Sequence, residues 1–178
     1  LWLQNIFGNR RLIQPEQLVF EPDPNKVPEG SISMFQGWPL VPNRDRPEDK
    51  CRLILNHLYK ICGSDPVLSK WVLSWLAYPL QHPGAKMHTA LLVFGEREGT
   101  GKSIFFNAVA KIYGRYSASI DQSAVQSEFN DWASQKLFII CEEVVTNQDR
   151  RNLKGALKNY ITKETNRINS KGMKERYE

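Results

Sequence analysis

Two stretches in the first half of the chain space their apolar residues as a helix with one buried face does. The pattern predicts helices over residues 47–61 and 66–81, and Asp65 precedes the second as an N-cap followed by proline. Trp71 and Trp75 stand at helical spacing in that second helix. Aromatic residues at this spacing usually belong to a core, so we expect core residues here rather than a platform for stacking bases.

From Thr89 onward, apolar runs alternate with amphipathic stretches. The pattern predicts strands that begin at Thr89 and span 116–120 and 137–143, helices at 102–113, 123–132 and 149–160, and a β-hairpin with arms 165–168 and 173–177 around a turn at 170–172. Strands that alternate with helices favour an α/β fold with a parallel sheet.

The N-terminal stretch differs in composition from the rest. Residues 1–47 are rich in proline, which predicts extended segments with a short hairpin around residues 32–41. The sequence therefore predicts three parts: this extended or hairpin segment at 1–47, a helical segment at 48–84, and an α/β core at 85–178.

A glycine-rich turn joins the strand that begins at Thr89 to the helix at 102–113. We expect Gly99 and Gly101 to take positive φ and to let the backbone approach an anion. The helix that follows would direct its N–H groups and its positive dipole end at the same point. The alternative is a glycine-rich strand-to-helix turn that contains Gly-Lys-Ser by chance.

The turn matches a phosphate-binding loop with one departure, because Glu96 stands where the strict G-x-x-x-x-G-K-[ST] pattern has glycine. Lys102 would reach the β- and γ-phosphates of ATP, and the Ser103 hydroxyl would ligate Mg²⁺. The residues predicted to contact the nucleotide are Glu98, Gly99, Thr100, Gly101, Lys102, Ser103 and Ile104.

Two carboxylates, Glu142 and Glu143, stand at the C-terminal end of the apolar strand predicted at residues 137–143. By position, Glu142 would order Mg²⁺ and its water shell, while Glu143 would polarise the attacking water. The alternative is a buried strand followed by a solvated acidic turn. The strand–helix unit between Lys102 and this pair favours the catalytic interpretation.

These segments resemble the ATPase core of superfamily 3 helicases, most closely the primase-helicases of phages, plasmids and poxviruses. The resemblance covers roughly residues 31–178 and includes upstream segments at 34–38, 61–63, 71–75 and 81–84. It implies a P-loop NTPase core of AAA+-like α/β fold with a parallel sheet, preceded by a small helical segment. It also implies a homo-oligomer, a hexamer in the longer parent, that uses ATP to translocate on single-stranded DNA and is often joined to a primase.

The resemblance further implies a polar sensor and an arginine finger, which we expect beyond Glu178. On that expectation this chain binds Mg²⁺ and ATP but hydrolyses little by itself. The first residue, Leu1, likewise suggests a fragment of a longer chain.

Positive charge is concentrated at the C-terminal end. Residues 150–178 hold nine Lys and Arg against three Asp and Glu, whereas the rest of the chain is nearly balanced. The helicase resemblance places Lys171 at the tip of a DNA-gripping hairpin, with Arg167 and Lys174 on its arms. The alternative for such a basic block is a solvated surface.

Composition excludes several other classes. The three cysteines form no CxxC pair, which argues against a zinc site or a disulfide framework and favours a reducing cytoplasm. The resemblance to phage and plasmid proteins implies that this is the cytoplasm of a bacterial cell. No apolar run approaches the roughly 20 residues of a membrane span, and residues 1–13 do not resemble a signal peptide. A phosphotransferase or switch ATPase that never contacts DNA, and a non-catalytic DNA-binding or assembly fragment, remain as alternative functions.

Overall fold

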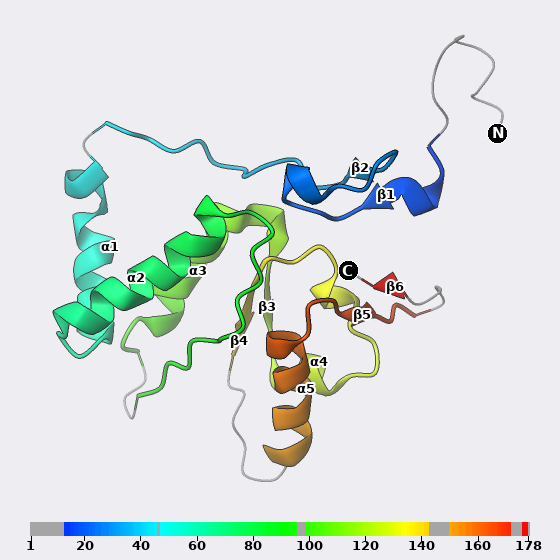
Figure 1. Cartoon of the computed structure of the whole chain (residues 1–178). Coiled ribbons are helices and arrows are strands. Elements are labelled where there is room, and N and C mark those ends of the chain that lie inside the picture. Colours follow the sequence, from blue (N-terminus) through cyan, green and yellow to red (C-terminus); the bar gives the residue numbers. More distant parts are fainter. Residues whose placement is uncertain (1–12, 46, 96–98, 143–149, 172–175, 178) are drawn as a thin grey trace. The chain divides into compact units, whose positions relative to one another are not determined.

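The computed structural model describes residues 13–45, 47–95, 99–142, 150–171 and 176–177. The chain separates into two compact units, Leu1–Gly37 and Trp38–Glu178. Figure 1 gives the order of the elements along the chain. Each unit is described by itself.

The first unit contains two short strands that pair in parallel. β1 (Leu18–Val19) aligns Leu18 with Ile32 of β2 (Ile32–Ser33). The hairpin expected around residues 32–41 is therefore wrong, because β2 pairs with an earlier segment instead of with the residues that follow it. The Ser33 hydroxyl reinforces this pairing by donating a 2.6 Å hydrogen bond to the Glu21 carbonyl.

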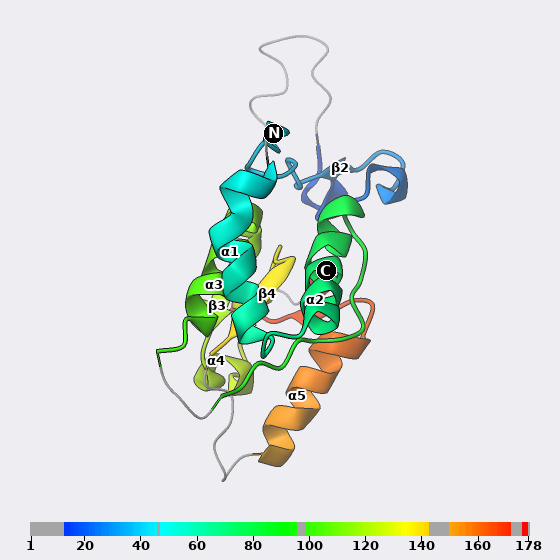
Figure 2. The same cartoon turned by 90° about the vertical axis from the view of Figure 1, so that its left-hand side faces the viewer.

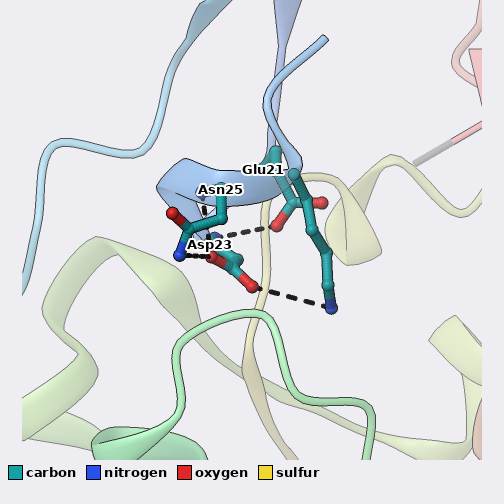
Figure 3. Close-up of polar contacts among 4 residues, drawn as sticks. Glu21, Asp23 and Asn25 are labelled. Atoms are coloured by element: carbon teal, nitrogen blue, oxygen red, sulfur yellow. Dashed lines mark hydrogen bonds and ion pairs between the residues drawn. The ribbon is translucent and has the colours of Figure 1, made fainter.

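Polar side chains in the first unit shape a turn (Figure 3). The Glu21 carboxylate accepts a hydrogen bond from the Asp23 N–H at 2.8 Å. Asp23 in turn accepts from the backbone and side-chain nitrogens of Asn25 at 3.0 and 3.2 Å. Asp23 is thereby the N-cap of a short 3₁₀ helix, Pro24–Lys26, and its carboxylate is engaged in these local hydrogen bonds.

Three predicted helices of the second unit are confirmed: α1 (Pro47–Ile61), α2 (Pro66–Gln81) and α3 (Lys102–Tyr113). The Asp65 carboxylate accepts hydrogen bonds from the first N–H groups of α2, as its N-cap position predicted. The core assignment of Trp71 is wrong, since 53% of it is exposed. The buried face of α2 runs through Val72 and Leu76, one helical turn apart, and Trp71 is about 100° away from it.

The second unit also contains a parallel strand pair and a short antiparallel one. β3 (Ser117–Ile120) pairs with β4 (Phe138–Cys141), and β5 (Arg167–Ile168) pairs with β6 (Arg176–Tyr177) in the antiparallel sense predicted for the hairpin. α4 (Gln122–Gln126) is shorter than the predicted helix at 123–132. A separate 3₁₀ turn covers Asp131–Ala133, and α5 is Arg150–Thr162.

The prediction of a P-loop NTPase core built on an extended parallel sheet is wrong. The sheets among the described residues have two strands each, and β3 and β4 both lie next to α3. The segment that begins at Thr89 is not a strand, and Leu92 and Phe94 are 79% and 86% exposed. An apolar run signals a tendency to be buried, but a strand forms only where another segment accepts its hydrogen bonds.

Aromatic packing holds α3 against the β3–β4 pair. Tyr113 is only 1% exposed. Its ring stacks on that of Phe138, with 4.9 Å between the ring centroids, and meets the Trp38 ring edge-on, with 5.3 Å between the centroids. α1 lies beside α3, as Figure 2 shows. Because α3 packs on β3 and is joined to it by the turn Gly114–Tyr116, helix and strand run in opposite directions. The start of α3 and the carboxyl ends of β3 and β4 therefore share one end of the unit.

Candidate functional site

Two glycines of the glycine-rich turn, Gly99 and Gly101, have the positive φ that the sequence predicts. Gly99 and Gly101 have φ values of 71° and 80°, both in the left-handed region. Gly101 is the N-cap of α3 and supplies no side-chain cap. The first intrahelical hydrogen bond runs from the Phe105 N–H to the Gly101 carbonyl at 3.1 Å. The helix thus begins without the capping oxygen that usually satisfies its first N–H groups.

The side chains that follow the turn are arranged around its opening. The Lys102 amine donates to the Thr100 hydroxyl at 2.9 Å, and a Cβ added to Gly95 would lie 3.4 Å from the amine nitrogen. The lysine therefore folds back over the turn. Ser103 and Ile104 are exposed beside it, whereas Glu98 lies outside the described residues.

Electrostatics at this end of α3 favour an anion. A helix N-terminus carries a partial positive charge, and here the first turn contains no acidic residue. Lys102 adds a full positive charge at the first helical position, where the helix dipole disfavours it. An anion bound at this point would relieve that repulsion and would accept hydrogen bonds from the uncapped N–H groups.

His57 of α1 is a member of this site that the sequence analysis missed. Its Nε2 lies 2.9 Å from the Gly101 carbonyl, a contact in which the ring nitrogen donates. A Cβ built on Gly101 would come within 2.5 Å of the imidazole ring. The two residues are 44 positions apart, and no local pattern connects them.

The acidic end of β4 lies at the same end of the unit as the start of α3. Glu142 is exposed, and its Oε1 accepts a 3.0 Å hydrogen bond from the hydroxyl of Ser119 on β3. Sequence reasoning missed Ser119 because only the strand register brings it beside Glu142. Glu143, the predicted catalytic base, lies outside the described residues.

Asp121, at the end of β3, has a different role. Its carboxylate is the N-cap of α4, and the Ala124 N–H, followed by the Ser123 hydroxyl, lowers its pKa. Within the described ranges, no three His, Cys, Asp or Glu side chains gather as a metal site. Magnesium usually keeps several waters and takes one or two protein oxygens together with phosphate oxygens. The Ser103 hydroxyl and the Glu142 carboxylate are oxygen donors of the kind that such an ion uses.

The predicted DNA-binding residues are only partly described. Arg167 on β5 and Lys171, in the turn that follows, are both exposed. Lys174 lies outside the described residues. The structure therefore places two of the three cations on the surface of one antiparallel pair and leaves their contact with DNA as a prediction.

Comparison with known proteins gives both sequence and structural relatives. Residues 93–178 match a family described as a family of unknown function, DUF5906. The DNA primase-polymerase of Nitratiruptor phage NrS-1 is 30% identical over 151 residues, which cover 81% of this chain and 20% of that protein. An apo structure of the NrS-1 C-terminal region matches 90% of this chain and 40% of its own, with 27% identity and a TM-score of 0.76. This chain is homologous to that region.

A second apo structure of the NrS-1 C-terminal region, its A form, agrees over 90% of this chain and 39% of its own, with 27% identity and a TM-score of 0.68. The chain spans about a fifth of the length of the curated NrS-1 relative. The likeness extends over both the helical segment and the later strands, since it covers nine-tenths of the chain. Among the described helices, none has the length and apolar character needed to cross a bilayer.

Proposed function

We propose that this chain is the nucleotide-binding part of a primase-related DNA replication protein encoded by a phage or plasmid. In the longer protein, ATP hydrolysis would drive movement along single-stranded DNA in the manner of superfamily 3 helicases. Homology to the NrS-1 primase-polymerase supports the role in replication. The start of α3 supports nucleotide binding. A homo-oligomer in the bacterial cytoplasm is the setting that fits this proposal.

One observation carries the nucleotide-binding proposal: α3 begins with features that weaken a helix unless an anion is present. Gly101 provides no cap, and Lys102 adds a positive charge at the positive end of the dipole. The lysine charge opposes the stability of an isolated helix, and the glycine leaves the first N–H groups without a side-chain oxygen. Such conflicts between local preference and structure are expected at functional sites.

The residues would divide the work as follows. The N–H groups at the start of α3 and the Lys102 amine would hold the phosphates of ATP. Ser103 and Glu142 would hold Mg²⁺, which neutralises phosphate charge when it is bound. Glu143 would accept a proton from the attacking water. Ser119 and His57 would act as positioning residues, because one orients the Glu142 carboxylate and the other binds the Gly101 carbonyl.

Single-stranded DNA is the partner that we propose for the basic C-terminal segment. Arg167, Lys171 and Lys174 would contact backbone phosphates, which fixes the position of the strand without selecting its sequence. The net positive charge of residues 150–178 supports this assignment. A protein that travels along DNA requires contacts of this sequence-independent kind.

Replacing Lys102 tests the nucleotide site. In a calorimetric titration with Mg²⁺ and ATP, Lys102→Ala should lower the affinity at least about tenfold, because a charge-assisted hydrogen bond contributes roughly 1.5–3 kcal/mol. Lys111→Ala, in the last turn of the same helix and exposed, is the matched control and should bind as the unaltered chain does. Equal ATP affinity in all three proteins, with unchanged circular dichroism, would refute the proposal.

A further inference from the structure

A second candidate site lies away from the start of α3. A groove of about 680 Å³ opens between the carboxyl-terminal half of α5, the segment that follows α4, and β5. α4 and α5 lie side by side (Figure 1). The volume of the groove falls within the roughly 300–1,000 Å³ that small-molecule sites occupy. Its lining is dominated by side-chain amides and includes two cations, Lys163 and Arg167.

One wall of the groove is held in place by the Asn130 side chain. Its Nδ2 donates to the Tyr160 hydroxyl and to the Arg167 carbonyl, both at 2.8 Å, and its Oδ1 accepts from the Asn169 N–H at 2.7 Å. Lys86 also donates to the Tyr160 carbonyl in the last turn of α5, at 2.8 Å. These bonds tie α5, β5 and the segment after α4 together, so the groove has a preformed wall.

Other lining residues offer hydrogen-bonding groups that the described part of the protein does not use. In the described part of the chain, the side chains of Asn159, Lys163 and Asn166 make no hydrogen bond or ion pair with another residue. All three line the groove. Asn159 lies in the last turn of α5, Lys163 directly follows that helix, and both are exposed. Each amide can donate and accept at the same time, while Lys163 only donates.

We propose that this groove holds one unpaired nucleotide of a single DNA strand, with its phosphate at Lys163 and its base edge at Asn159 and Asn166. Side-chain amides match the adjacent donors and acceptors of a base edge, and lysine binds backbone phosphate. The inference rests on the proposed role in binding single-stranded DNA, and it adds a base-contacting site.

Charge favours a strand over a free nucleoside triphosphate. Lys163 and Arg167 bring two positive charges to the groove, and Glu128 brings one negative charge. This small positive excess suits the single negative charge of a phosphodiester better than the several charges of a triphosphate. β5 also leads directly to Lys171, so a strand held in the groove would continue along the basic hairpin.

The test measures strand binding by fluorescence anisotropy, using a labelled oligothymidylate of about 15 nucleotides and an abasic strand of the same length. The altered proteins are Lys163→Ala and the double variant Asn159→Ala/Asn166→Ala. Their matched controls are Lys60→Ala and Asn56→Ala, both exposed on α1. Circular dichroism checks that each variant is folded.

We expect the amide double variant to bind oligothymidylate at least about fivefold more weakly than the unaltered chain does, with an unchanged salt slope. On the abasic strand, which has no base edges to lose, the double variant and the unaltered chain should bind equally well. Lys163→Ala should weaken binding to both strands and lower the log–log salt slope by about 0.7. If both groove variants bind like their controls while the unaltered chain binds DNA, the groove is rejected and the proposed function stands. If the unaltered chain binds neither strand, the DNA-binding part of that function falls as well. Loss of ATP binding in the amide variant would overturn the inference in favour of a free-nucleotide site.

Discussion

Gly101 and His57 show how residues far apart in sequence build the start of α3. The sequence predicts positive φ at Gly101, because the glycine of Gly-Lys-Ser allows the turn that a phosphate requires. It does not predict His57, since that contact depends on the packing of α1 against α3. Local backbone conformation was predictable here, whereas a tertiary neighbour was not.

Replacing Gly101 with alanine should destabilise the chain by about 2 kcal/mol or more. A non-glycine residue in the left-handed region costs roughly 1–2 kcal/mol, and the new Cβ would also overlap His57. In the His57→Ala background only the backbone part of the cost should remain. Urea unfolding measures both losses, and equal losses in the two backgrounds would contradict the predicted overlap.

Gly155 provides the matched control for that experiment. It lies inside α5 with no atom within 4 Å of an added Cβ, and it does not have positive φ. Gly155→Ala should therefore stabilise the chain, by up to about 1 kcal/mol, because alanine is the better helix former. If Gly155→Ala destabilised the chain as Gly101→Ala does, the loss at Gly101 could not be assigned to overlap with His57.

Tyr113 should make stability depend on pH in the alkaline range. Burial raises the pKa of its hydroxyl from 10.0 to about 12, so the folded chain keeps a proton that the unfolded chain loses. The contribution of this group to stability is fully present below pH 10 and is lost as the pH rises through 12, by roughly 3 kcal/mol for two pKa units. Tyr113→Phe should remove this loss when unfolding free energies at pH 9 and pH 11.5 are compared. The same decline in both proteins would show that other groups cause it.

Helices with local signals were predictable, and isolated strands were not. α1, α2 and α3 match their predicted bounds because proline, Asp65 and glycine mark their ends. The strand expected from Thr89 is absent because its apolar residues have no hydrogen-bonding partner there. β2 was expected in a hairpin but pairs with β1, and nothing in its own sequence encodes that choice.

The β5–β6 pair allows a test of the predicted DNA contact. Reversing the charge of the exposed Lys171 to Glu should weaken binding to all single-stranded sequences alike and lower the log–log salt slope by about 0.7. Lys70→Glu, on the exposed surface of α2, is the matched control. Salt titrations of labelled oligonucleotides measure both slopes. An unchanged slope for Lys171→Glu would assign this segment to solvated surface charge.

Across the whole chain, the motifs predicted a relative more accurately than they predicted a fold. The phage and primase parts of the predicted resemblance agree with homology to a phage primase-polymerase, whereas the helicase part stays a prediction. The P-loop NTPase core inferred from the same motifs is wrong, because the sheets that the described residues form have two strands each instead of making the expected larger one. A short motif specifies the turn and helix that contain it, whereas sheet size depends on strand partners elsewhere in the chain.

The most direct test of the account is to locate ATP on the folded chain. Backbone amide resonances of the ¹⁵N-labelled protein would be followed as Mg²⁺ and ATP are added. The account predicts that the largest shifts occur at Gly101, Lys102, Ser103 and Ile104, with smaller ones at Glu142. It also predicts that Lys102→Ala removes these shifts at the same ATP concentration. Shifts confined to other parts of the chain, or none at a saturating concentration, would contradict it.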